Sequence, residues 1–362
     1  MTDPTASSHG SPAAGVRGPD IWYGSEMSGS VSWIRHLTEG EIREIHLAVG
    51  RVERMGLDIA GITRDDFPLP GLAPELARIR EELLRGRGFV LMRGLPVDGR
   101  SMRQIATAFW GIGTHLGEAI SQNAKGHLLG HVKDIGHDPH NPEHRLYATR
   151  ARHRFHTDSC DLVGLFCVRP AKEGGLSSIS SSATIYSEMR RRRPDLAALL
   201  SRPIHIDRKG EIPEGKGPYY RMPVFNHHAG CITTYYARDF FDGAQRHEGV
   251  PPVSREQTEA MDLFEDLAAR PDIRLDMELR PGDMQFVHNH QIVHSRTGYE
   301  DHPEPERKRH LLRLWLSASD GRELPPAYAE RYGNIALGTK RGGIMVPGTK
   351  PHAPLEAEET TR

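Results

Sequence analysis

The N-terminal third of the chain has apolar residues at helical spacing, three or four positions apart, over two segments. The first segment begins with a potential capping box at Thr38 and Glu41, and the second ends near Gly86. Their apolar positions are Ile42, Ile45, Val49 and Val52, followed by Leu76, Ile79 and Leu83. A glycine-bounded apolar run at residues 88–94 predicts a buried strand. A third predicted helix carries Ile105, Phe109 and Ile112, so this third of the chain is expected to mix α and β.

From about residue 145 the pattern changes to short stretches that are apolar throughout or alternate between apolar and polar residues, as strands do. These stretches are residues 146–158, 162–168, 177–182, 231–237, 273–279, 284–294 and 310–318. Two predicted helices interrupt them, one at about 182–193 and one capped by Ser254 with Gln257. Many short strands and few helices predict a mainly β fold of the sandwich or jelly-roll type. We expect one domain over residues 21–362, preceded by a flexible tail at residues 1–20.

The balance of charged residues indicates which kinds of partner the protein binds. The 47 basic and 48 acidic residues give a formal net charge of −1, so no global field attracts nucleic acid or an anionic membrane. A small-molecule partner is expected, and a homo-oligomer is the general expectation for such a chain. No apolar run is long enough to span a bilayer, and the N-terminus lacks the apolar segment of an export signal. Three widely spaced cysteines form no disulfide or zinc-finger pattern, which fits a reducing cytoplasm.

Residues 155–161 contain a histidine and a carboxylate two positions apart. On a strand, His156 and Asp158 would project to the same side and contact one ion, and Cys160 shares their parity. An imidazole and a carboxylate together suit a first-row divalent metal. The same pair also occurs by chance on solvated strands, so by itself it leaves both interpretations open.

A second cluster, in residues 284–294, places His288, His290 and His294 at one parity. Any one of these would complete a set of two histidines and one carboxylate, which leaves positions open on iron for oxygen chemistry. Three protein ligands suit catalysis, whereas a structural site usually has four.

A pair of arginines follows these histidines. Arg309 and Arg313 are four positions apart in an apolar stretch, which predicts that they share one face of a strand. A guanidinium in such surroundings favours a carboxylate, which its planar fork binds through two hydrogen bonds. That carboxylate is either an anionic co-substrate or an acidic neighbour with a structural role.

Taken in order, these motifs resemble a known family. His156-Thr157-Asp158, Gly174-Gly175, residues 282–289, His294 and the two arginines are similar to the motifs of the taurine dioxygenase and clavaminate synthase family of iron(II)- and 2-oxoglutarate-dependent oxygenases. The resemblance covers residues 145–320, and residues 88–96 are similar to the strand that opens the family's core. It implies a double-stranded β-helix, a cupin-like jelly roll, with helices packed outside it.

The resemblance also implies the metal ligands and the reaction. His156, Asp158 and His294 would bind iron(II), and His294 is preferred because it follows Asn289 by five positions, as in the family. The enzyme would use dioxygen to oxidise an unactivated C–H bond of a small molecule while 2-oxoglutarate is converted to succinate and carbon dioxide. Related halogenases have a small residue in place of the carboxylate, so Asp158 indicates hydroxylation, although desaturation or ring chemistry uses the same ligands.

Further residues are assigned by the same resemblance. Arg309 would hold the distal carboxylate of 2-oxoglutarate, Arg313 would contact the co-substrate or an anionic substrate, and Ser177 stands near the position of a family threonine that touches 2-oxoglutarate. Candidate substrate contacts are Gln122, Asn123, Tyr220, Arg221 and Arg313, although Gln122 and Asn123 also suit a surface loop capped by polar side chains. Of these residues, Arg313, Arg221 and Asn123 favour an anionic or amino-acid-like substrate. Residues 216–226, which include Tyr220 and Arg221, form either a lid or a plain connection.

Two other functions use the same residues. A zinc-dependent hydrolase would bind zinc through the same three ligands and activate water, but it would give the two arginines no role. A non-catalytic jelly-roll protein would bind a ligand without consuming oxygen. The spacing of the arginine pair favours the oxygenase.

Overall fold

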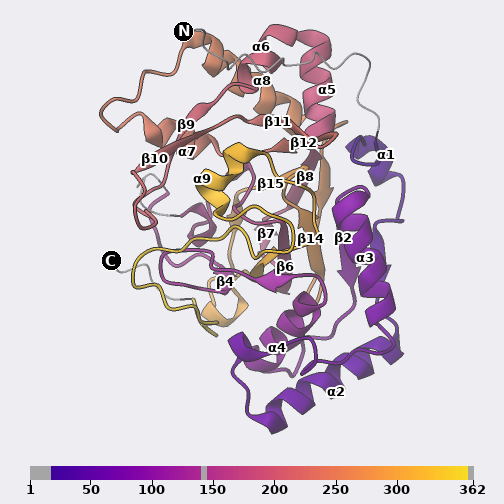
Figure 1. The fold of residues 1–362 in the computed structure, drawn as a ribbon. Coiled ribbons are helices and arrows are strands. Elements are labelled where there is room, and N and C mark those ends of the chain that lie inside the picture. The colour runs from indigo at the N-terminus through magenta and orange to yellow at the C-terminus, as the bar shows by residue number, and fades with distance from the viewer. Residues whose placement is uncertain (1–17, 140–144, 358–362) are drawn as a thin grey trace.

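The computed structural model describes residues 18–139 and 145–357, so residues 1–17 of the predicted tail lie outside it. Its centre is a seven-stranded sheet in the order β1-β2-β14-β6-β17-β3, with β4 also paired to β17 (Figure 1). The strands are β1 (Ile34–His36), β2 (Phe89–Arg93), β3 (Glu118–Ala119), β4 (Leu129–Val132), β6 (Leu162–Arg169), β14 (Met284–His288) and β17 (His310–Ser317).

A smaller four-stranded sheet, in the order β13-β8-β15-β5, lies against the larger one. Its strands are β5 (His153–His156), β8 (Ser177–Ser181), β13 (Leu275–Met277) and β15 (Ile292–Arg296). Three two-stranded antiparallel pairs complete the described strands: the hairpins β9 (Ile204–Asp207) with β10 (Tyr219–Met222) and β11 (Phe225–His228) with β12 (Cys231–Thr234), and the long-range pair β7 (Glu173–Gly174) with β16 (Tyr299–Glu300).

Alternation along the strands explains how the two sheets pack. In β17, Leu311 and Trp315 join the core between the sheets, while Leu312 and Leu314 face the helices on the outside. In β15, Ile292 belongs to the same inner core, which includes residues of both sheets. Two sheets that share one core in this way confirm the predicted jelly roll.

Helices cover the outer faces of both sheets (Figure 1). On the side of the larger sheet lie α2 (Glu39–Met55), α3 (Ala73–Arg85) and α4 (Met102–Thr114), and on the side of the smaller sheet lie α5 (Ser182–Arg192), α6 (Pro194–Leu200) and α8 (Arg255–Ala269). Shorter helices are α1 (Gly24–Ser28), α7 (Arg238–Ala244) and α9 (Ala329–Tyr332), with 3₁₀ turns at Ile59–Gly61, Leu146–Ala148, Pro305–Arg307 and Pro326–Tyr328.

The predicted capping boxes at the starts of α2 and α8 are confirmed. The Thr38 hydroxyl accepts a hydrogen bond from the backbone N–H of Glu41, and the Glu41 carboxylate accepts one from the N–H of Thr38. Ser254 and Gln257 do the same for α8. Each box satisfies backbone donors that have no partner inside the helix, which fixes where the helix begins. No helix in the described residues is both long and apolar enough to cross a membrane.

Three of the predicted stretches have a different local structure. Residues 146–158 do not form one strand, because a 3₁₀ turn precedes β5 and β5 ends at His156. Residues 284–294 form two strands, β14 and β15, joined by a turn at residues 289–291. Residues 216–226 contain β10 and the start of β11, both paired in hairpins, so this stretch is part of the sheet structure.

Candidate metal centre

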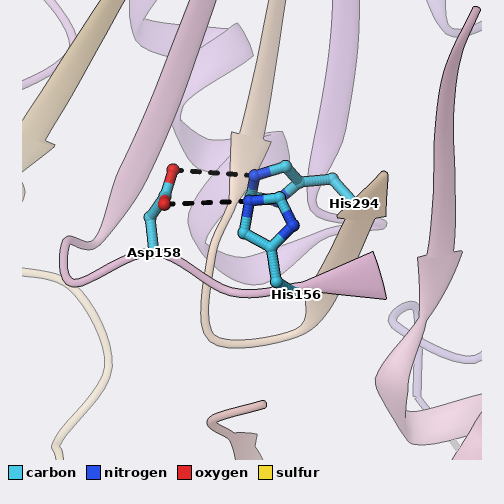
Figure 2. A group of neighbouring side chains, drawn as sticks. All are labelled: His156, Asp158 and His294. Carbon is cyan, nitrogen blue, oxygen red and sulfur yellow. Dashed lines mark ion pairs between the residues drawn. The ribbon is translucent and has the colours of Figure 1, made fainter. Parts of the chain in front are cut away.

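Two histidines and one aspartate meet at the edge of the smaller sheet (Figure 2). His156 ends β5, and His294 is its direct partner on the antiparallel strand β15. The His156 Nε2 atom lies 3.9 Å from Asp158 Oδ1, and the His294 Nε2 atom lies 3.6 Å from Asp158 Oδ2. Each residue offers one donor atom, and all three donors lie within 4.8 Å of one another. The structure therefore brings together the three residues that the sequence analysis selected.

Asp158 reaches this position from a loop, and the prediction that it shares a strand with His156 is wrong. Its backbone N–H donates to Asn289 Oδ1 at 2.8 Å, and Asn289 Nδ2 donates to the carbonyls of Asp158 at 2.6 Å and Cys160 at 3.0 Å. Asn289 lies in the turn between β14 and β15. The loop is thus fixed to the hairpin that carries His294, which holds the carboxylate beside both imidazoles.

The other candidate ligands are placed elsewhere. The parity that grouped His288 and His290 with His294 assumed one strand, and the hairpin turn breaks it. His290 Nε2 lies 2.7 Å from Asp161 Oδ1, and Arg341 Nη2 is 3.0 Å from the same oxygen, in a fully buried cluster. His288 is fully buried at the end of β14. Cys160 packs in the apolar core between the sheets.

The surroundings of Asp158 favour its ionised form. Burial raises the pKa of this carboxyl, but the Arg313 guanidinium, with Nη1 3.8 Å from Asp158 Oδ2, and the His294 imidazole outweigh burial and hold the pKa below its ordinary value. The Trp315 indole N–H also donates to Asp158 Oδ2 at 2.9 Å. Burial and the neighbouring His294 lower the pKa of His156 to about 3. An ionised carboxylate and a neutral imidazole are the forms that bind metal.

The donor set therefore fits a first-row divalent metal. Two imidazole nitrogens and one carboxylate oxygen lie within 4.8 Å of one another, and such a set of three protein ligands leaves other positions on the metal open. The His156 Nδ1 atom is 2.8 Å from the Arg154 carbonyl, a contact that fixes the ring so that Nε2 faces Asp158.

Two buried guanidiniums lie near the double glycine. Arg309 and Arg296 stack on the ring of Tyr299, with guanidinium carbons 5.0 and 4.9 Å from its centroid. Arg309 Nη1 and Arg296 Nε and Nη1 are buried without a hydrogen-bond partner, and neither side chain pairs with a carboxylate among the described residues. Burial and the neighbouring Arg309 charge lower the pKa of Arg296 to about 10. Asp301 and Asp134 act on these cations only from beyond ion-pair distance, and two buried guanidiniums with free donors and no direct carboxylate partner indicate a binding site for a carboxylate.

Gly175 leaves the space that Arg309 occupies. Its φ of +70° is unfavourable for residues with a side chain, and a Cβ there would lie 3.1 Å from Arg309 Nε. Ser177 begins β8 directly opposite Arg296, and its hydroxyl donates to Gln285 Oε1 at 2.8 Å. Arg296 was missed in the sequence analysis, although it follows His294 by two positions on one strand and therefore shares its face.

A cavity of about 440 Å³ opens beside the triad, and His156 and Asp158 form part of its wall. Arg313 and Gln122 also line it, with Arg313 Nε donating to Gln122 Oε1 at 2.6 Å. The Arg313 guanidinium lies over the rings of Tyr147, at 4.7 Å, and Trp315, at 5.1 Å. Arg309 precedes β17 and contacts Tyr299, whereas Arg313 lies within β17, so the two predicted anion-binding arginines contact different groups.

The remaining predicted substrate residues do not line this cavity. Asn123 accepts hydrogen bonds at Oδ1 from the backbone N–H groups of Lys125 and His127, which is the role of a turn-forming side chain. Tyr220 is buried with its ring 6.5 Å from that of Tyr235, which does line the cavity. Arg221, the next residue on β10, is exposed. The sequence analysis missed Tyr147, Trp315 and Arg331 of the cavity wall, because no motif marks them.

Comparison with known proteins gives consistent results. A family model described as taurine catabolism dioxygenase TauD, TfdA family matches residues 53–315. The chain is 32% identical over 341 residues to FR-33289 synthase of Streptomyces rubellomurinus (strain ATCC 31215), covering 93% of this chain and 98% of that protein.

Solved structures show the same fold. An asparagine oxygenase in complex with Fe(II), 3-hydroxyasparagine and succinate has a TM-score of 0.59 at 17% identity, covering 85% of this chain and 99% of that one. The non-heme iron oxygenase OrfP in complex with Fe and alpha-ketoglutaric acid has a TM-score of 0.58 at 16% identity, covering 84% of this chain and 100% of that one.

Proposed function

Since the chain belongs to the TauD/TfdA family of dioxygenases, we propose that His156, Asp158 and His294 bind the iron(II) of an iron(II)- and 2-oxoglutarate-dependent dioxygenase. The enzyme is an oxidoreductase of this class, with dioxygen as the oxidant and 2-oxoglutarate as co-substrate. The single observation that carries the ligand assignment is the convergence of these three donors within 4.8 Å.

We assign the distal carboxylate of 2-oxoglutarate to Arg309, with Arg296 as a second cation. Three buried nitrogens of the two guanidiniums lack partners, and a carboxylate would accept their hydrogen bonds. The unsubstituted Gly175 leaves Arg309 its space, and Ser177 lies opposite Arg296 on β8. This set of contacts selects a dicarboxylate over a monocarboxylic keto acid, because only a dicarboxylate brings a second negative charge to the two cations.

The protein's own groups prepare the site for oxidation. Bound iron(II) supplies the chemistry that couples decarboxylation of 2-oxoglutarate to oxidation of a C–H bond by dioxygen. Asn289 fixes the loop that carries Asp158 by a hydrogen bond to the Asp158 backbone. The Trp315 indole N–H donates to Asp158 Oδ2, which leaves Oδ1 facing His156. The aromatic rings of Tyr147 and Trp315 form an apolar part of the cavity wall beside the metal ligands, where they would exclude water from the substrate.

The substrate is a small molecule that enters the cavity beside the triad. A volume of about 440 Å³ is within the range of small-molecule sites. We propose an anionic or amino-acid-like substrate that contacts Arg313, and hydroxylation as the reaction. The asparagine oxygenase structure named above holds a hydroxylated amino acid, which supports this class without fixing the compound.

An anaerobic titration tests the metal and co-substrate assignments. Metal-free protein is titrated with iron(II) and then 2-oxoglutarate, and the visible charge-transfer absorption of the chelated keto acid is followed. We expect a band in the native protein, no band in His294→Ala, and a band that needs much more 2-oxoglutarate in Arg309→Leu. If His294→Ala kept the band, the ligand assignment would be wrong.

The zinc-dependent hydrolase has no support in the comparisons, and it still leaves Arg309 and Arg296 without a role. The prediction of one domain over residues 21–362 is supported by the larger sheet, which pairs strands from residue 34 to residue 317. We retain a cytoplasmic location as a proposal, because none of the three cysteines forms a disulfide.

A further inference from the structure

The cavity beside the triad has an excess of basic side chains. Its described lining includes six basic residues, Arg145, Arg154, Lys209, Arg238, Arg313 and Arg331, and three acidic ones, Asp158, Asp239 and Asp242. Asp158 belongs to the triad and would be neutralised by the metal. Two other acidic residues therefore remain in the described lining beside its six basic ones, so any further balance has to come from carboxylates behind the wall.

Three of the basic residues have carboxylate partners of their own. These pairs are Arg145 with Glu211, Arg238 with Asp242 and Asp262, and Arg154 with Glu265. In contrast, Lys209 and Arg331 form no ion pair among the described residues, and the carboxylate paired with Arg313 is Asp158, at 3.8 Å. Lys209, Arg313 and Arg331 therefore have no ion-pair partner among the described residues other than the metal ligand Asp158, while the more distant carboxylates of Asp239 and Asp207 offset part of the charge of Lys209.

Arg331 is the strongest of these candidates. It lies on α9 with 9% of its surface exposed, and its Nε donates to the hydroxyl of Ser159 at 2.7 Å. Ser159 directly follows the metal ligand Asp158 and also lines the cavity. Burying a guanidinium without a counter-charge is costly, so this site is stabilised when an anion binds.

Lys209 is a second cation in the cavity wall, and its backbone conformation is strained. It has a φ of 49°, which is unusual for a residue other than glycine, and its ammonium lies 4.7 Å from the centroid of the Phe240 ring. Burial, followed by the charge of Arg145, lowers its pKa. This like-charge repulsion would be relieved by an anion between the two groups.

The co-substrate does not account for this charge. The two guanidiniums that we assign to 2-oxoglutarate, Arg309 and Arg296, are not among the residues that line the cavity. An amino-acid zwitterion has no net charge and would leave the excess unbalanced.

We propose that the substrate carries an oxyanion with more than one negative charge, of the phosphate or phosphonate type, and that Arg331 and Lys209 bind it together with Arg313. This inference rests on the proposed function, because it takes the cavity beside the triad as the substrate site. It goes beyond the anionic or amino-acid-like class by requiring a group with a double charge and by assigning Arg331 and Lys209.

The test uses the enzyme loaded with iron(II) and 2-oxoglutarate without oxygen, and three probes of similar size: phenylphosphonate, phenylalanine and benzyl alcohol. Calorimetry gives the Kd of each. We expect phenylphosphonate to bind most tightly, and its phosphorus NMR signal to broaden with iron(II) but not when zinc(II) replaces iron(II), because the paramagnetic ion lies near the oxyanion. Arg331→Gln should raise its Kd about tenfold or more, Arg331→Lys should recover part of the loss, and the exposed Arg255→Gln should change nothing.

The charge-transfer band of bound 2-oxoglutarate, measured in the same samples, distinguishes failure of the proposed function from failure of the substrate proposal. If native protein forms no band, the proposed function fails. If the band forms but phenylphosphonate binds no more tightly than phenylalanine, or Arg331→Gln binds it as native protein does, the substrate inference is overturned and the proposed function stands. Should Arg331→Gln fail to form the band, Lys209→Gln provides the same comparison.

Discussion

The Trp315 indole gives the sharpest test of how the chain holds its metal ligand. Its N–H donates to Asp158 Oδ2 at 2.9 Å, with Trp315 4% and Asp158 9% exposed. Trp315→Phe removes this donor and keeps an aromatic ring beneath the Arg313 guanidinium, which lies 5.1 Å from the indole. The substitution therefore separates the hydrogen bond from most of the packing.

The size of the effect follows from the charge of the acceptor. A buried hydrogen bond to an ionised group contributes about 1.5–3 kcal/mol, and loss of a contact that orients a metal ligand lowers metal affinity by roughly 10- to 100-fold. We therefore expect the iron(II) affinity of Trp315→Phe to be roughly 10- to 100-fold lower than that of native protein. Arg313 stays near Asp158 Oδ2 at 3.8 Å, so the carboxylate remains ionised and the loss is one of orientation.

Competition with a chromophoric chelator under anaerobic conditions measures the iron(II) affinity, and thermal unfolding of the metal-free protein reports any loss of packing. Trp110→Phe is the matched control, because the Trp110 indole N–H also makes a buried hydrogen bond, 3.0 Å from the Ile62 carbonyl and away from the triad. Equal iron(II) affinity in native protein and Trp315→Phe would refute the reasoning. So would an equal loss in both tryptophan variants, since that would indicate general destabilisation.

Three further predictions concern the co-substrate site and the effect of pH. Arg296→Leu should raise the 2-oxoglutarate concentration needed for the charge-transfer band about tenfold or more, because it removes one of two cations that have no ion-pair partner. The iron(II) affinity should not change. If the required 2-oxoglutarate concentration also stayed the same, Arg296 would have no role in binding 2-oxoglutarate, and Arg309 would act without it. Gly175→Ala should also weaken 2-oxoglutarate binding and should lower the free energy of unfolding by about 1 kcal/mol or more, because its φ is +70° and its Cβ would lie 3.1 Å from Arg309 Nε. Chemical denaturation and 2-oxoglutarate titration check both effects, with Gly210→Ala, which also has positive φ but no neighbour within 4 Å, as the control for backbone strain alone. For the pH dependence, burial and the neighbouring His131 lower the pKa of His310 to about 3 from 6.5, so the unfolded chain takes up the proton first as the pH falls. The free energy of unfolding of metal-free protein should therefore decrease from pH 6.5 towards pH 3, and His310→Gln should reduce the slope by up to about 1.4 kcal/mol per pH unit; an unchanged slope in urea denaturation series would exclude His310 as a source.

Several features of this protein follow from local sequence alone. Apolar spacing predicted α2, α3 and α4, and the two capping boxes predicted the starts of α2 and α8, because helix periodicity and capping depend on residues within one or two turns. Residues 310–318 were likewise predicted to form a strand, and the structure adds that Leu311 and Trp315 face the other sheet while Leu312 and Leu314 face the helices. The choice of His294 over His288 and His290 came from resemblance to a family, and strand parity could not have made it.

Tertiary structure decided how these pieces meet. The turn at residues 289–291 reverses the chain, so His290 pairs with Asp161 while His294 returns to face His156. Asp158 belongs to no strand, and its position depends on Asn289, which is 131 residues away in sequence.

Tertiary structure also decided which of the predicted substrate residues line the cavity. Gln122 reaches the cavity and the adjacent Asn123 does not, while Arg331, which no motif marks, lies in the cavity wall. Periodicity reports which side of its own strand or helix a side chain occupies. Contact between distant segments depends on strand pairing, register and turns, and the close approach of Arg296 and Arg309 around Tyr299 is set at that level.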